Sequence, residues 1–193
     1  MQRALSILVL FLVIAGQASA ARASSYAEAI DSFAQAGQSA DYFKNSYGYA
    51  VFPTIGKGGI GIGGAYGEGR VFVNSKHVGD STLTQVTLGF QLGGQAYSQI
   101  IFFEDADAFR HFTSGNFEFS AQATAVAITA GVSAEANTGG GMSAGASGGR
   151  NDATTVHGGY RKGMAVFTIA KGGLMYEAAL GGQKFTYKAL GGS

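Results

Sequence analysis

The stretch KGGIGIGGAYGEGR, residues 57–70, decides how the rest of the chain is interpreted. Seven of its fourteen residues are glycine, and Gly59, Gly61 and Gly64 stand at the G-x-G-x-x-G spacing of dinucleotide-binding loops. Such a loop must lead into a helix, yet glycine recurs at alternate positions to Gly69, and a helix cannot be sustained there. The segment therefore predicts a glycine-rich β-hairpin, and we expect no nucleotide site.

A second copy of this pattern lies near the other end of the chain. Residues 50–60, AVFPTIGKGGI, resemble residues 165–174, AVFTIAKGGL, once Pro53 is treated as an insertion. After Pro53 the offset between the copies is a constant 114 residues, which aligns Lys57 with Lys171. The second copy keeps Lys-Gly-Gly but loses the later glycines, which a strand tolerates and a phosphate loop does not. The two copies suggest paired hairpins that meet when a sheet closes.

The composition points to a small, strongly curved sheet. The chain has 32 glycines, 14 phenylalanines and 9 tyrosines, but one proline and no cysteine, among 193 residues. This aromatic content argues against disorder, and glycine within strands marks tight bends and close backbone contacts. The lack of cysteine excludes disulfides, thiolate metal sites and a cysteine nucleophile.

The expected elements together give an α+β fold. Ser25 stands in capping-box register with Glu28 and predicts the start of a helix, and residues 40–45 predict a second, short helix. From Tyr49 onward the hydrophobic period is two, which is typical of strands. Residues 104–114 predict one internal helix, because acids occupy its first turn. The sequence predicts a strongly bent, mostly antiparallel sheet or small β-barrel, with the N-terminal helices and the internal helix packed on it.

The expected strands are residues 50–52 (ended by Pro53), 60–66, 70–74, 83–92, 96–103, 117–136, 154–160, 164–169, 174–180 and 184–188.

Residues 1–20 are expected to be a secretory signal peptide. Arg3 gives a positive start, an apolar run follows to Gly16, and Ala18-Ser19-Ala20 supplies the small-x-small pattern before cleavage at Ala21. The apolar run is shorter than the roughly 20 residues that span a bilayer. We expect export to the periplasm or beyond, with a single domain over residues 21–193, a core over about 26–189 and a flexible glycine-rich loop over 137–151.

The charge balance and the polar residues exclude several classes of function. The chain holds 13 basic and 12 acidic residues, and removal of Arg3 with the leader leaves it neutral, so we expect no nucleic-acid partner. The three histidines have no metal-ligand spacing, and Glu104, Asp105 and Asp107 stand where acids ordinarily cap a helix. No serine lies in a Gly-x-Ser-x-Gly elbow. We expect no enzyme, no metal and no cofactor.

The two Lys-Gly-Gly copies supply the candidates for a lipid head-group site, which are Lys57, Gly58, Gly59, Lys171, Gly172 and Gly173. A lysine beside backbone amides that no side chain shields can hold an anionic group. The alternative is that both lysines are ordinary solvated turn residues, and the residues alone leave both interpretations open.

A series of motifs in order along the chain resembles the SYLF domain. These motifs are YGYAVFP (47–53), GKGG (56–59), GGAYGEG (63–69), GGQAYSQIIFF (93–103) and VFTIAKGGLM (166–175). The resemblance covers nearly all of the chain after the leader, and it implies a lipid-binding module. Eukaryotic members of the family are associated with phosphoinositide membranes and with actin, usually beside other domains.

We expect this chain to differ from those members in having a leader, no companion domain and an N-terminal helix that is not basic. We therefore assign none of the membrane-binding residues of the eukaryotic members to positions in this chain. We expect neither actin nor phosphoinositides as partners of an exported bacterial protein. The resemblance implies binding of a phospholipid or other amphiphile, or of a membrane surface, in the cell envelope. The alternative is a structural or protein-interaction module of the envelope that has a protein partner and no lipid ligand.

Overall fold

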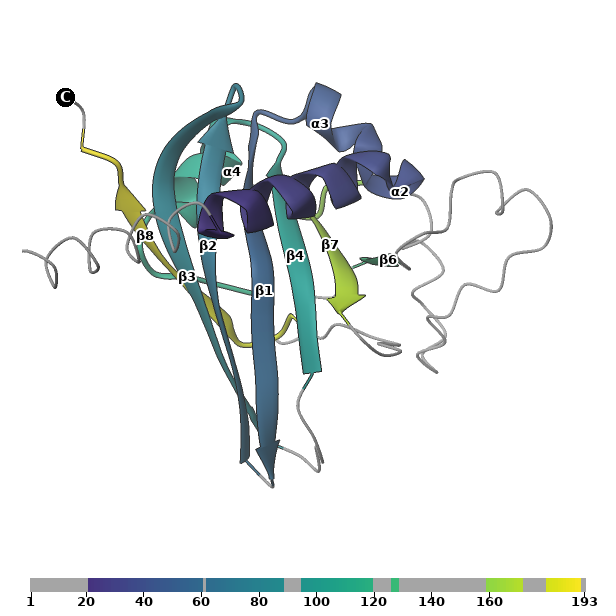
Figure 1. Cartoon of the computed structure of the whole chain (residues 1–193). Coiled ribbons are helices and arrows are strands. Elements are labelled where there is room, and N and C mark those ends of the chain that lie inside the picture. The colour runs from purple at the N-terminus through teal and green to yellow at the C-terminus, as the bar shows by residue number, and fades with distance from the viewer. Residues whose placement is uncertain are drawn as a thin grey trace, which may run out of the picture.

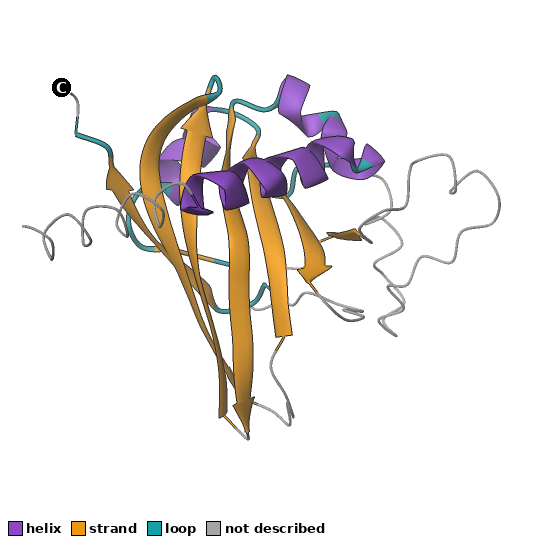
Figure 2. Ribbon diagram, viewed as in Figure 1, coloured by secondary structure: helices purple, strands orange, loops and turns teal. Residues whose placement is uncertain are grey.

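A computed structural model describes residues 21–60, 62–88, 95–119, 126–128, 159–171 and 180–191. The first range opens in a helix over residues 21–35. The labelled elements are α2 (Gly37–Ala40), α3 (Tyr42–Asn45), β1 (Gly48–Ile60), β2 (Ile62–Val73), β3 (Lys76–Leu88), β4 (Gln95–Phe103), α4 (Ala106–Phe112), β5 (Phe117–Glu118), β6 (Val126–Ile128), β7 (Met164–Lys171) and β8 (Gln183–Ala189). Helices lie on both faces of one curled sheet (Figures 1 and 2).

The described strands form one eight-stranded sheet in the order β5-β8-β3-β2-β1-β4-β7-β6. Neighbouring strands are antiparallel except β6 and β7, which are parallel. The predicted α+β fold with a strongly bent, mostly antiparallel sheet is therefore confirmed. The glycine-rich segment is a β-hairpin, as predicted, because β1 and β2 pair down to Ile60 and Ile62.

Three predicted strands are confirmed over their length as β4, β7 and β8. The expected leader, the expected loop over 137–151 and the predicted strand segments over 89–92, 120–125, 129–136, 154–158 and 174–179 lie outside the described residues. Phe119, Tyr160 and Leu180 were predicted to lie in strands, and the structure places all three outside them.

The sheet curls until distant strands touch across its inner face. Gln99 on β4 donates from Nε2 to Oε1 of Gln183 on β8 at 3.0 Å, although β1, β2 and β3 separate these strands in the sheet. The rings of Phe52 on β1 and Phe185 on β8 lie 5.6 Å apart between centroids. These contacts close the sheet into a half-barrel with an inner and an outer face.

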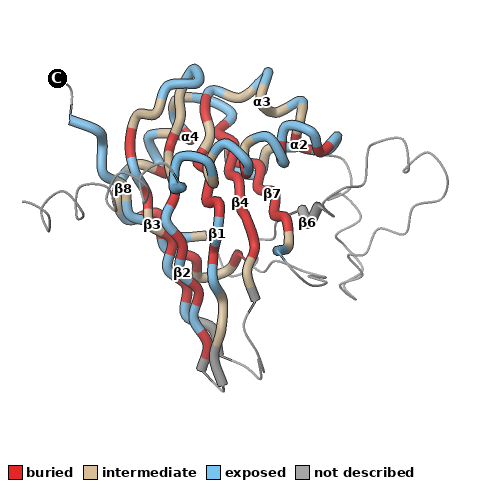
Figure 3. The backbone as a smooth tube through the Cα atoms, in the orientation of Figure 1, coloured by how far each residue is buried: buried red, intermediate tan, exposed pale blue. Residues whose placement is uncertain are grey.

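Two hydrophobic cores lie on the two faces of the central strands, because alternate residues point to opposite sides. On β4, Ile101 contributes to the inner core, and Phe102 contributes to the outer core. Phe112 of α4 fills the inner core, and Phe33 of the helix over residues 21–35 fills the outer one. β1, β4 and β7 are consequently buried along much of their length (Figure 3).

Pro53 does not end the first strand, which corrects the prediction from sequence. β1 runs through it to Ile60, and the register with β2 shifts between Val51 and Ile55. Proline has no N–H to donate to the ladder, and a bulge is a place where a strand tolerates it. The Pro53 carbonyl accepts a hydrogen bond from Oγ of Ser98 at 2.7 Å on β4, which ties the bulge to the sheet.

The helices differ from the predictions in detail. Ser25 lies inside the first helix, where its Oγ donates to the Arg22 carbonyl at 2.8 Å, so its predicted role as a cap is wrong. The predicted second helix is divided into α2 and α3, which are separated at Asp41. The internal helix is confirmed as α4, whose N-cap Asp105 accepts a hydrogen bond from the Ala108 amide at 2.8 Å.

The packing at Gly69 yields a stability prediction. A Cβ at Gly69 would lie 2.5 Å from Cε1 of Phe52, a fully buried ring, whereas a Cβ at Gly56 would meet nothing within 4 Å. We expect Gly69→Ala to lower the free energy of unfolding by about 1–3 kcal/mol because the site is overpacked. The control Gly56→Ala should change it by less than about 0.5 kcal/mol. Urea denaturation measures both, and equal stabilities would contradict this packing.

Candidate functional site

The two lysines of the repeated motif lie on opposite faces of the sheet. Lys57 on β1 pairs with Ala65 of the inner core, so it belongs to the inner face. Lys171 ends β7 two residues after Ile169 of the outer core, so it belongs to the outer face. Through β4, Lys171 is aligned with Gly56, one residue away from Lys57. Because the side-chain period of a strand is two, this one-residue offset reverses the face.

The two copies therefore do not form the equivalent paired hairpins that the sequence suggested. β1 pairs with β2, whereas β7 lies between β4 and β6 in the sheet. Lys57 and Lys171 nevertheless lie at nearly the same level along the strands. Their role in binding a head group stays a prediction.

A third lysine lies at this level, at the end of a row of cross-strand partners on the outer face. The row runs through six strands as Lys184, Thr84, Tyr66, Gly56, Ala96 and Lys171. We refer to Lys57, Lys171 and Lys184 as the lysine level. The structure thus brings cations from β1, β7 and β8 to one level of a curved sheet.

The three lysines differ in what they contact. Nζ of Lys171 donates to Oγ1 of Thr54 at 3.0 Å, and Nζ of Lys184 lies 3.6 Å from Oε2 of Glu118. Within the described part of the chain, the half-buried Lys57 has no ion pair or side-chain hydrogen bond. An exposed ion pair contributes only about 0–1 kcal/mol, so the pair with Glu118 holds Lys184 weakly. Lys171 and Lys184 can therefore exchange these contacts for an external anion, and Lys57 has none to give up among the described residues.

Sequence reasoning did not identify Lys184 as a site residue. Its place depends on the pairing of β8 with β3, where Lys184 faces Thr84 from a distant part of the chain. The available indication was the repeat, which aligns Lys184 with Arg70. Arg70 has a different task, because its guanidinium carbon lies 4.3 Å from the ring centroid of Tyr26 and holds the first helix on the outer face.

The glycines beside Lys57 are strand residues. Gly58 pairs with Gly64, and Gly59 pairs with Gly63, so this segment belongs to the ladder between β1 and β2. The other two candidate glycines, Gly172 and Gly173, lie outside the described residues. An anion contact through the amides of these glycines stays a prediction.

A comparison with protein families identifies the chain's relatives. The family model described as "Ysc84: Las17-binding protein actin regulator" matches residues 84–188, which is more than half of the 193 residues. The chain belongs to the Ysc84 family. The resemblance to the SYLF domain is thereby confirmed. No curated protein matches the chain.

Membership of the Ysc84 family supports, at the level of the family, a function as a module that binds lipid or protein. Across the described ranges, no helix has both the length and the apolar character needed to cross a membrane.

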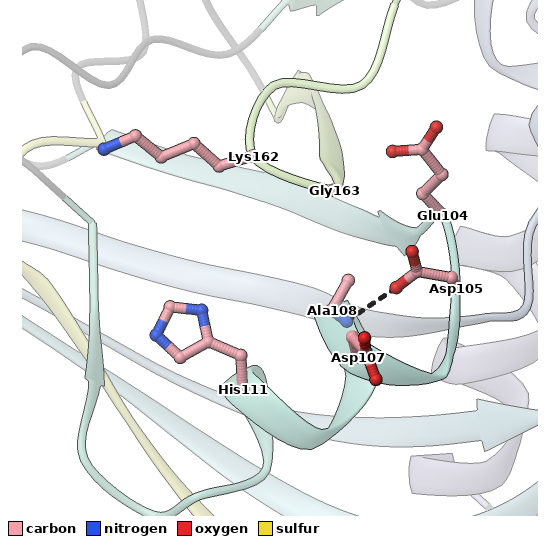
Figure 4. Close-up of a pocket in the computed structure, with 7 residues that line it drawn as sticks. All are labelled: Glu104, Asp105, Asp107, Ala108, His111, Lys162 and Gly163. Carbon is pink, nitrogen blue, oxygen red and sulfur yellow. Dashed lines mark hydrogen bonds between the residues drawn. The ribbon is translucent and has the colours of Figure 1, made fainter.

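This member of the Ysc84 family also has a surface pocket of about 350 Å³ beside the start of α4 (Figure 4). Its lining residues are Glu104, Asp105, Asp107, Ala108, His111, Lys162 and Gly163. Asp105 caps the helix, as predicted, and Asp107 pairs with Arg110 at the surface. His111 and Lys162 lie on the far side of the pocket from Glu104 (Figure 4). Among the residues that the structure describes, no group of three His, Asp or Glu side chains is arranged to hold a metal ion.

A second polar cluster is buried on the inner face, where Gln183 Nε2 donates to Oη of Tyr97 at 3.2 Å. The same amide donates to Oε1 of Gln99 at 3.3 Å, and Gln99 returns a bond to Gln183. Burial raises the pKa of Tyr97 to about 12, and the hydrogen bond from Gln183 opposes this shift. Tyr97 therefore stays neutral at physiological pH and serves the fold as a hydrogen-bonding partner.

The raised pKa of Tyr97 predicts how stability depends on pH. Above pH 10, tyrosine ionises in the unfolded chain, whereas Tyr97 in the folded protein stays neutral up to about pH 12. The free energy of unfolding should therefore fall by up to about 1.4 kcal/mol per pH unit in this window because of Tyr97 alone.

In Tyr97→Phe this contribution disappears, so the free energy of unfolding should fall less steeply as the pH rises from 10 towards 12. Urea denaturation at several pH values measures both slopes. The other tyrosines titrate in both proteins and cancel in the comparison. Identical slopes would show that Tyr97 ionises as easily in the folded protein as in the unfolded chain.

Proposed function

We propose that this protein is an exported, non-catalytic lipid-binding protein of the bacterial cell envelope. The observation that supports it best is the lysine level, which puts Lys57 on the inner face and Lys171 and Lys184 on the outer face. Ammonium groups bind phosphates through charge-assisted hydrogen bonds. The ligand we propose is a phospholipid surface that carries anionic groups.

The spacing of the lysines favours a surface over a single small anion. Lys184 and Lys171 are separated by five strand-to-strand steps in their row. At about 4.8 Å per step, this is about 24 Å along the curved sheet, which is more than one phosphate can bridge. A membrane supplies many anionic groups and can meet cations that lie this far apart.

The absence of catalysis is part of the proposal. Asp105 caps α4 and Asp107 forms a surface ion pair with Arg110, so both of these acidic residues have structural roles. The neutral Tyr97 is engaged by Gln183 within the inner core.

The family description names Las17 binding and actin regulation. A protein that is exported from a bacterium meets neither partner, so we propose lipid in their place. The competing function is a protein-interaction module of the envelope, which the words "Las17-binding protein" in the family description favour. A stable complex with an envelope protein, isolated without lipid, would support that alternative.

Export has a direct test. Because Ala18-Ser19-Ala20 ends an apolar run, we expect the mature protein to begin at or near Ala21. The intact mass of the protein from the periplasmic fraction measures this. A full-length mass, or retention in the cytoplasm, would exclude export.

Lipid binding is tested with the double variant Lys57→Gln with Lys171→Gln. We expect wild-type protein to co-sediment with anionic vesicles more strongly than with neutral ones, and less so as salt screens the contact. A basic residue near an anionic surface contributes about 1 kcal/mol, so the double variant should bind anionic vesicles about 30-fold more weakly.

The matched control is Lys44→Gln with Lys76→Gln, which removes the same charge from exposed positions away from the lysine level. Circular dichroism confirms that each variant is folded. If the control pair weakens binding as much as Lys57→Gln with Lys171→Gln, binding depends on net charge and the lysine level is not the site. If wild-type protein does not distinguish anionic from neutral vesicles, the proposed ligand is wrong.

A further inference from the structure

At one end of the sheet, the residues that the structure describes carry no charge. Beyond the lysine level, towards the turn between β1 and β2, the described strands continue through residues 58–60, 62–65 and 85–88, and none of these residues is charged. The last cross-strand pair is Ile60 with Ile62. In Figure 1 this hairpin extends away from the helices and forms the lowest part of the described molecule.

Exposed apolar side chains lie on the outer face at the lysine level (Tyr66) and just beyond it (Val86). Val86 is 75% exposed and Tyr66 is 54% exposed, which is unusual for large apolar side chains in the middle of a sheet. Val86 faces Gly64 on the neighbouring strand, and a glycine has no side chain to cover it. Tyr66 stands two residues along from Gly64, on the same outer face. The uncharged end thus offers apolar surface to something outside the chain.

The opposite end of the sheet has the reverse character. Around it the chain places Lys76 and Asp80 on β3, Glu104 after β4, and Arg161 and Lys162 before β7. Among the described residues, the lack of charge is therefore confined to one end of the sheet. An apolar end bordered by cations matches a bilayer, whose apolar interior is bordered by phosphates.

We propose that the uncharged end of the sheet inserts into the interface of an anionic bilayer, with the lysine level at the depth of the phosphates. This inference rests on the proposed function and adds the surface and the orientation. Ile60 is three residues from Lys57, which is about 10 Å along a strand. Interfacial segments bury about 5–10 Å into the boundary between head groups and acyl chains, and lysine stems reach back towards the phosphates.

The first helix does not offer an equivalent surface while the protein is folded as described. Ala29 and Phe33 on its apolar side are buried in the outer core, at 5% and 0% exposure. Presenting that side to lipid would require the helix to leave the sheet and expose Phe102. The uncharged end needs no such rearrangement, because the side chain of Val86 is already exposed on the outer face.

The chain contains no tryptophan, so one introduced tryptophan reports a single place. The reporter is Val86→Trp, and its matched control is Leu190→Trp, which is also an exposed apolar position at 44% and lies beside Val78 near the opposite end. The probe is vesicles of phosphatidylglycerol and phosphatidylcholine, with and without brominated acyl chains. We expect the fluorescence of Val86→Trp to shift to the blue and to be quenched by the brominated lipid, and that of Leu190→Trp to do neither.

A second pair of variants tests the inference without adding an aromatic ring. Val86→Asp places a charge at the uncharged end and should weaken co-sedimentation with the same vesicles by more than about tenfold, since it removes the transfer of one valine and adds an acid near lipid phosphates. Leu190→Asp changes the net charge equally and should leave binding unchanged.

The outcomes separate this inference from the proposed function. Binding of wild-type protein without quenching of Val86→Trp, or with equal loss in both Asp variants, would overturn the orientation and leave lipid binding standing. Absence of binding by wild-type protein would overturn both. Capture of a protein through Val86 and Tyr66 in a preparation free of lipid would also count against insertion.

Discussion

The reciprocal amide contact between Gln99 and Gln183 is the constraint on which the rest of the structure depends. It joins β4 to β8 across the inner face, although three strands lie between them in the sheet. Both side chains are fully buried, and an unmade buried hydrogen bond costs about 1–3 kcal/mol. The pair therefore fixes how far the sheet curls, and the curl determines which face encloses α4 and which face receives the first helix.

The features of the fold that the sequence predicts are those encoded locally in the chain. Period-two alternation, the glycine-rich hairpin and the acid-capped helix are encoded within a few residues of one another, so the antiparallel bent sheet and Asp105 as a cap were predictable. Whether Pro53 ends a strand depends on the register of two neighbouring strands, which no local pattern specifies. Whether Ser25 caps a helix depends on where that helix begins, and the structure places it inside the helix.

The candidate site was predictable in part for a similar reason. The repeat identified Lys57 and Lys171, and the structure puts both at one level of the sheet. The repeat could not predict that the two lysines lie on opposite faces of the sheet. The face follows from a one-residue offset in the pairing of β1 and β7 with β4. Nor could the repeat assign Lys184 to the same level, since that needs the pairing of β8 with β3.

The same long-range pairing has a kinetic consequence. β1, β2 and β3 follow one another in the chain and can pair as soon as they are made, but β8 joins β3 last, and Oγ of Ser81 reaches the Thr186 carbonyl across 105 residues of sequence. Contacts between residues this distant in the chain form slowly. Until β8 docks, Phe52 lacks the ring of Phe185 that packs against it. The half-assembled sheet is therefore the state in which a newly made chain is most prone to aggregate, and the speed of its last strand governs its yield.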